Sequence, residues 1–151
     1  MIFYRLERLA RRTASEAFSG EGGLHYALRW NSRGTRLVYA STSVALCCLE
    51  TLVHMQMVNK SEERWLFMID VADRYVEELR QLPRDWDAEP ATAASRAVGD
   101  RWVTSARSLA LLVPSVVVPL EKNALINPRH PQFRLDWVKK PVRFRYDPRL
   151  K

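Results

Sequence analysis

The sequence predicts an α+β fold in which mixed and antiparallel strands pack against helices. Strand-like and helix-like segments follow one another without the regular βαβ alternation of a doubly wound nucleotide-binding fold. No Gly-rich phosphate loop of the Rossmann or Walker type is present. The length of 151 residues, of which 47% are hydrophobic, suits one core, so we expect a single domain over residues 1–151.

The first third of the chain predicts a hairpin followed by a helix. Residues 24–30 alternate between apolar and polar side chains, as a strand does, and residues 31–34 supply a turn. Residues 35–40 are rich in β-formers and provide the second strand. The hydroxyls of residues 41–43 are good N-caps, so a helix is expected from about Ser43 to Met57.

The rest of the chain is expected to mix strands and helices. A buried strand over 65–71 precedes a charged helical segment over 73–81, which the proline and aspartates of 83–87 end. A helix follows around 91–107. The remaining expected elements are short strands over 109–113 and 115–119, an Asn- and Pro-rich loop over 127–131, and terminal strands.

The charge is concentrated at the two ends of the chain. Of the net +7, residues 1–36 carry +4, residues 37–133 carry −2 and residues 134–151 carry +5. A basic protein attracts nucleic acid, anionic nucleotides and acidic protein partners alike, so charge alone does not choose among them. The tail over 139–151 alternates basic and apolar residues, which is typical of an edge strand with a charged outer face.

Several classes of protein do not fit this sequence. The most apolar stretch, 109–120, contains two prolines and is shorter than the roughly 20 residues of a membrane span. The N-terminus lacks the apolar block of a secretory signal, so a cytoplasmic location is expected. Cys47 and Cys48 are adjacent and the three histidines are scattered, so we assign no disulfide framework and no metal.

Glu50 is the most conspicuous candidate for chemistry. It is the only Asp, Glu, Lys or Arg between Leu37 and Asn59. On a helix it would lie beside an apolar stripe, where a carboxylate is costly unless it is paired or used. The alternative is a glutamate at the helix edge that reaches solvent or pairs with His54.

Three further residues each have a functional and a structural interpretation. Arg29 could hold a phosphate or carboxylate with two parallel hydrogen bonds, although a lone strand arginine is usually solvated. Tyr39 is by default a half-buried packing aromatic. Ser115 lies in an apolar run, where its hydroxyl needs a partner, most simply the backbone.

A series of short segments resembles the RES domain family, which is named for an Arg, a Glu and a Ser. The resemblance covers nearly the whole chain. Its segments are 18–22 (Phe-Ser-Gly-Glu-Gly), 29–35 (Arg-Trp-Asn-Ser-Arg-Gly-Thr), 38–41 (Val-Tyr-Ala-Ser), 45–54 with Glu50, 99–102 (Gly-Asp-Arg-Trp), 112–119 (Leu-Val-Pro-Ser-Val-Val-Val-Pro) and 123–131. One departure is Ala27-Leu28, where many members have Gly-Gly.

The resemblance implies a fold similar to that of ADP-ribosyltransferases and a toxin of a bacterial toxin–antitoxin pair. Such proteins consume NAD or transfer its ADP-ribose, so NAD is the expected substrate and no cofactor is expected. The implied partner is an Xre-like helix-turn-helix antitoxin, with DNA contacted only through that antitoxin; a homo-oligomer is left open.

The resemblance also implies roles for individual residues. The family arginine, tyrosine, glutamate and serine correspond to Arg29, Tyr39, Glu50 and Ser115, the expected catalytic set. Arg5 and Asn31 join Arg29 and Tyr39 in the expected NAD-binding set.

In the mechanism that this implies, Glu50 stabilises the oxocarbenium-like ribose that forms when nicotinamide leaves. The arginines hold the pyrophosphate, the tyrosine stacks on nicotinamide and the serine orients Glu50 or a substrate hydroxyl. Two rival hypotheses remain at this point: a basic module or toxin that binds nucleic acid without NAD chemistry, and a non-catalytic interaction protein in which Glu50 and Arg29 pair with each other.

Overall fold

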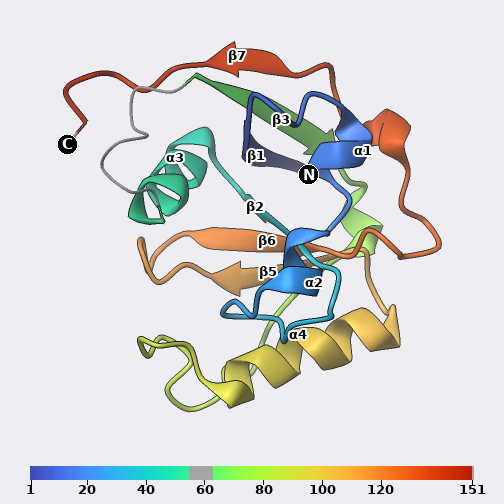
Figure 1. Ribbon diagram of the computed structural model, residues 1–151. Helices are drawn as coiled ribbons and strands as arrows, with labels where there is room; N and C mark the ends of the chain where they lie inside the picture. The colour runs from blue at the N-terminus through green and yellow to red at the C-terminus, as the bar shows by residue number, and fades with distance from the viewer. Residues whose placement is uncertain (55–62, 151) are drawn as a thin grey trace.

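A single mixed sheet of seven strands organises the computed structural model, which describes residues 1–54 and 63–150 (Figure 1). The strand order is β4-β5-β6-β2-β1-β3-β7, and only the β4–β5 pair is parallel. The strands are β1 (Ile2–Arg8), β2 (Val38–Ser41), β3 (Arg64–Asp70), β4 (Val76–Glu78), β5 (Ala110–Pro114), β6 (Lys122–Ile126) and β7 (Val142–Phe144). The predicted α+β class with mixed and antiparallel strands is confirmed.

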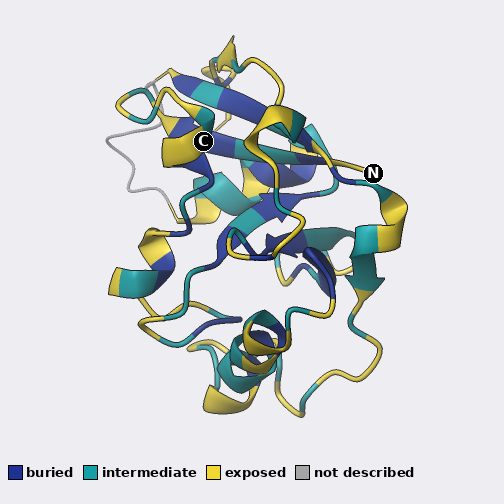
Figure 2. Ribbon diagram, turned by 90° about the vertical axis from the view of Figure 1, so that its right-hand side faces the viewer, coloured by how far each residue is buried: buried dark blue, intermediate teal, exposed yellow. Residues whose placement is uncertain are grey.

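Four helices and two 3₁₀ turns flank the sheet in the described part of the chain. They are α1 (Ala14–Ala17), α2 (Gly22–His25), α3 (Val44–Val53), α4 (Ala93–Ser105), η2 (Asp73–Tyr75) and η3 (Leu135–Trp137). In Figure 2 the buried residues follow the central strands, and the exposed ones lie on the surrounding helices and loops. None of these helices is both long and apolar enough to cross a membrane.

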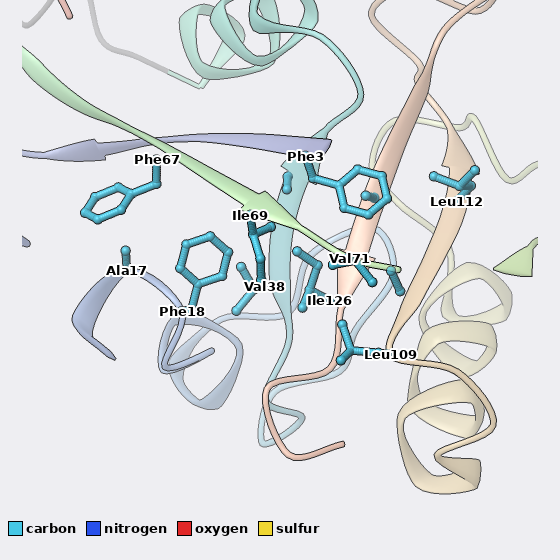
Figure 3. Close-up of a cluster of buried hydrophobic side chains, with 13 residues drawn as sticks. Phe3, Ala17, Phe18, Val38, Phe67, Ile69, Val71, Leu109, Leu112 and Ile126 are labelled. Atoms are coloured by element: carbon cyan, nitrogen blue, oxygen red, sulfur yellow. The ribbon is translucent and has the colours of Figure 1, made fainter. Parts of the chain in front are cut away.

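The core divides between the two faces of the sheet because side chains alternate along each strand. One cluster joins α1 to the sheet, with Phe18 packed edge-on against Phe67 at a ring separation of 6.2 Å (Figure 3). A second cluster places Trp102 of α4 against Leu111 and Leu125. A third packs Cys47 of α3 against β1 and β3. Helices α3 and α4 are thereby fixed over strands that carry the candidate site.

Most of the elements expected from periodicity and capping are confirmed. Strand β3 and helix α4 fall within one or two residues of their predicted bounds, and β5 does likewise. Helix α3 begins after its predicted cap, Ser43, whose hydroxyl accepts a hydrogen bond from Leu46 N. The predicted end of this helix at Met57 lies outside the described residues. The tail carries the expected edge strand, β7.

The predicted hairpin is wrong. Residues 22–25 form α2, and Leu28 and Asn31 close a tight turn that carries Arg29 at its tip. Strand β2 overlaps the predicted 35–40 strand but pairs with β1 and β6. Gly23 allows α2 to pack closely on the loop before β2, because a Cβ there would lie 2.1 Å from Thr35 O.

Two other predicted elements are also wrong. Residues 73–81 form η2 and then β4, because pairing with β5 prevails over the helical charge pattern. Residues 115–119 form bends leading into a turn, because Pro119 lacks a backbone donor and the Ser115 hydroxyl accepts from Val118 N. Strands β1 and β6 were not predicted.

Candidate functional site

Glu50 lies on α3, half-buried, and is held by neutral donors. The Ser115 hydroxyl donates to Glu50 Oε1 at 2.7 Å, and Asn123 Nδ2 donates to the same oxygen. Among the described residues Glu50 forms no salt bridge, and the alternative pairing with His54 is not formed. The carboxylate is therefore oriented without being neutralised.

Ser115 is fully buried at the end of β5 and connects Glu50 to the backbone. Its hydroxyl accepts a hydrogen bond from Val118 N at 2.9 Å while donating to Glu50. Its own amide donates to Glu121 O. The backbone partner and the Glu50 partner, which the sequence offered as alternatives, are thus both present.

Asn123 is a site residue to which sequence reasoning assigned no role. It lies on β6 directly opposite Ser41 of β2, and the Ser41 hydroxyl donates to Asn123 Oδ1 at 2.7 Å. This bond orients the amide so that Nδ2 faces Glu50. A polar residue directly before the apolar run 124–126 was the available signal, but its partner is 73 residues away.

The second Glu50 oxygen, Oε2, has no hydrogen bond to any described residue, whereas Oε1 accepts two. A carboxylate oxygen can accept hydrogen bonds from a ligand through its free lone pairs. This arrangement suits a ligand hydroxyl at Oε2 and the stabilisation of a nearby developing positive charge.

Tyr39 anchors a second cluster, two residues from Ser41 on the same face of β2, which is roughly 7 Å along the strand. Its hydroxyl donates to Asn31 Oδ1 at 2.8 Å and accepts from Trp30 N at 3.1 Å. Burial raises the pKa of Tyr39 well above its ordinary value of 10.0, so the phenol keeps its proton.

Asn31 is completely buried and holds the turn around Arg29 in place. Besides accepting from Tyr39, its amide donates to the carbonyls of Tyr26 and Ser32, each at 3.0 Å. Ala27 and Leu28, the residues that replace Gly-Gly, are both exposed on this turn.

Arg29 is bound to a neighbouring loop and not to Glu50. Its Nη1 donates to the carbonyls of Trp86 and Ala88, at 2.7 and 2.8 Å, and its Nη2 forms an ion pair with Glu89 at 3.2 Å. The pairing between Arg29 and Glu50 that one rival hypothesis required is therefore absent.

Arg5 of β1 joins three elements through one guanidinium. Its Nε donates to Ala17 O at 2.9 Å, Nη1 donates to Tyr39 O at 2.7 Å, and Nη2 pairs with Glu7. The structure thus links Arg5 with Tyr39, Tyr39 with Asn31, and Glu50 with Ser115. Within the described ranges, no group of three His, Cys, Asp or Glu side chains is arranged to hold a metal ion.

Comparison with known proteins gives a consistent result. The sequence model of the RES domain matches residues 2–147. "Toxin Res" of Yersinia enterocolitica is 41% identical over 155 residues, covering all of both chains. The "Prs ADP-ribosylating toxin" of a Sphingobium species is 40% identical and covers 98% of this chain and 95% of that protein.

A solved structure has the same fold. It is the M. tuberculosis MbcT-MbcA toxin-antitoxin complex, of which the matching chain has a TM-score of 0.74 at 20% sequence identity. The match covers 95% of this chain and 84% of that one.

Proposed function

This chain belongs to the RES domain family, and on that basis we propose that it is the toxin of a bacterial toxin–antitoxin pair that breaks the nicotinamide–ribose bond of NAD. The observation that carries the chemistry is the arrangement of Glu50, whose Oε1 is held by Ser115 and Asn123 while its Oε2 has no hydrogen-bond partner among the described residues. We further propose that the whole chain acts as a single domain, in the cytoplasm and with NAD as its substrate rather than a bound cofactor.

The relatives support an activity on NAD. Curated relatives of matching length are named as toxins, and one is named for ADP-ribosylation.

In ADP-ribosylation from NAD, the bond between the ribose carbon and the nicotinamide nitrogen breaks, and its electron pair leaves with nicotinamide. The acceptor oxygen or nitrogen attacks the ribose carbon and loses a proton. NAD glycohydrolysis, NAD phosphorolysis and protein ADP-ribosylation differ only in the acceptor, which is water, phosphate or a protein.

Glu50 performs the central step. The ribose carbon becomes positively charged as nicotinamide leaves, as in glycoside hydrolysis. Oε2 accepts a hydrogen bond from a ribose hydroxyl and places its negative charge beside the developing cation. Ser115 and Asn123 fix the carboxylate in advance, so little reorganisation is needed during the reaction.

The remaining expected site residues bind and orient the dinucleotide. Arg29 can exchange its Glu89 partner, which is 84% exposed and so weakly held, for an anionic phosphate. Arg5 holds the backbone of Tyr39 in place by donating to Tyr39 O. Tyr39 offers an aromatic face to the positively charged nicotinamide ring, and Asn31 fixes the tyrosine hydroxyl.

The decisive test is the isosteric substitution Glu50→Gln, assayed by nicotinamide release from NAD. The amide keeps an oxygen for Ser115 and Asn123 but loses the charge, so kcat should fall by about 100-fold or more. Glu78→Gln, at an exposed position on β4, is the matched control and should retain parental turnover. Equal turnover by Glu50→Gln and the parent would refute the assignment.

The acceptor and the partner need separate experiments. Product analysis with and without inorganic phosphate distinguishes ADP-ribose, ADP-ribose 1-phosphate and a modified protein.

We propose an Xre-like helix-turn-helix antitoxin as the partner, since a solved toxin of this fold is bound to its antitoxin. Co-expression with an Xre-like antitoxin should restore growth and yield a stable complex.

A further inference from the structure

A hollow of about 630 Å³ lies between α1 and the segment that follows β6. In Figure 1 these two parts, far apart in sequence, lie side by side. Arg36, just before β2, and Pro128, just after β6, both line it. The Glu50 cluster meets the same strands at Ser41 and Asn123, their opposite ends, roughly 10 Å along the strand pair. The hollow is therefore separate from the candidate site.

The hollow gathers positive charge that the protein does not neutralise. Arg36 reaches it from the segment before β2, and Arg129 and Arg134 reach it from the segment after β6. Asp136 is the one carboxylate among its lining residues. None of these four side chains forms a salt bridge with any described residue.

Arg36 is the most buried of the three arginines, and not all of its guanidinium donors have a hydrogen-bond partner among the described residues. Its Nη1 donates to Ser19 O at 3.1 Å, while its Nε is buried without a hydrogen-bond partner among the described residues. Arg129 and Arg134 are exposed beside it. The exposed guanidinium groups of Arg129 and Arg134 form no salt bridge with a described residue, so their donors are available to an anion in the hollow.

The shape and lining indicate the class of anion. The volume falls in the range of small-molecule sites, and Phe18, Phe133 and Leu135 add an apolar wall beside the guanidinium groups. Three forked guanidiniums offer more donors than one carboxylate can accept, whereas phosphate groups present several acceptor oxygens. We propose that this hollow is a second binding site, for a small phosphate-bearing anion, and that it is independent of NAD turnover at Glu50.

The proposal is tested with pyrophosphate and ADP as probes, and with adenosine as the phosphate-free control, by calorimetry and thermal unfolding. Pyrophosphate and ADP should bind and raise Tm, and adenosine should not. ADP binding more tightly than pyrophosphate would mean that the apolar wall contacts the nucleoside; equal affinity would mean that the phosphates alone are recognised. No binding of either phosphate probe by the parent would overturn the proposal.

Variants distinguish the hollow from the candidate site and from general charge effects. Arg129→Glu with Arg134→Glu should weaken pyrophosphate binding by about tenfold or more, because both side chains are exposed and can change without unfolding the protein. Arg80→Glu with Arg145→Glu makes the same charge change at exposed positions elsewhere and should have little effect. If Arg29→Ala abolished pyrophosphate binding and the hollow variant retained it, the anion would belong to the NAD site and the proposal would be wrong.

Discussion

At the scale of single residues, the candidate site depends on how the charge of Glu50 is held. Glu50 is the one charged residue in a long uncharged stretch of the sequence. Its partners among the described residues are a serine hydroxyl and an asparagine amide, with no cation. Neutral donors orient the carboxylate without adding a positive charge beside it. A salt bridge would have offset the charge that the proposed transition state requires.

Asn123→Asp tests this at neutral pH. The substitution keeps the shape but replaces the Nδ2 donor with an oxygen, so a second carboxylate faces Glu50 and the two ionise less readily together. We expect kcat for NAD to fall by about 10- to 1000-fold, with a smaller change in KM, and the pH profile to move upward. Steady-state kinetics between pH 5 and 9 measure all three.

Ser41→Ala is the companion variant, because Ser41 only orients the amide of Asn123. It should lower kcat less than Asn123→Asp and leave the pH profile in place. A parental pH profile and kcat in Asn123→Asp would show that Asn123 is not a positioning residue.

At the scale of elements, α4 fixes the turn that carries Arg29. Asp100 of α4 accepts hydrogen bonds from Ser32 N at 3.0 Å and from the Thr35 hydroxyl at 2.7 Å. Trp30, next to Arg29, stacks on Trp86 with ring centroids 6.2 Å apart. The turn, the 86–89 loop and α4 therefore form one packed unit around the Arg29 guanidinium.

Gly99→Ala should disturb this unit. A Cβ at Gly99 would lie 1.7 Å from Trp30 O, so α4 or the turn must move, at a cost of about 1–3 kcal/mol in the free energy of unfolding. The apparent affinity for NAD should weaken as well, since Arg29 moves with the turn. Urea unfolding and KM measurements check the two effects.

Gly22→Ala is the matched control, since a Cβ there meets nothing within 4 Å. Its stability should equal or slightly exceed that of the parent, because alanine restricts the unfolded chain. Equal stability of the two variants would contradict the close packing of α4 against the turn.

At the scale of the whole molecule, the sheet buries titratable groups that are neutral at ordinary pH. Burial raises the pKa of the Cys47 thiol from 9.0 to about 12 and that of Tyr146 from 10.0 to about 12. Both lie in the cluster that packs α3 and the tail onto β1 and β3. The folded state thus favours the protonated form of each group.

The free energy of unfolding should therefore fall as the pH rises from about 9 to 12. In this window the unfolded chain has released protons that the folded chain still holds, so the slope of stability against pH is negative. Tyr146→Phe removes one such group and should make the slope shallower between pH 10 and 12. Chemical unfolding at fixed pH values tests this, and an unchanged slope in Tyr146→Phe would contradict it.

Sequence reasoning succeeded where the structure depends on local patterns. Strand β3, helix α4 and the Ser43 cap of α3 follow from apolar runs, periodicity and a hydroxyl at the right place. The predicted hairpin partner of β2 and the predicted helix at β4 were wrong, because these segments pair with strands that are distant in the sequence. The catalytic and binding roles of Glu50, Ser115, Tyr39, Arg29, Arg5 and Asn31 stay predictions.

The amino-acid sequence by itself determined the α+β class, the family and the singular position of Glu50, because composition, motif order and the absence of nearby charges can all be read along the chain. Only the tertiary structure decided that Asn123 and Ser115 hold Glu50, that Arg29 is bound to the 86–89 loop, and that three arginines surround a separate hollow. The physical reason is that hydrogen bonds and unneutralised charges depend on distance in space. The hydrogen-bonded groups lie 57 to 73 positions apart in the sequence, so only folding brings them together.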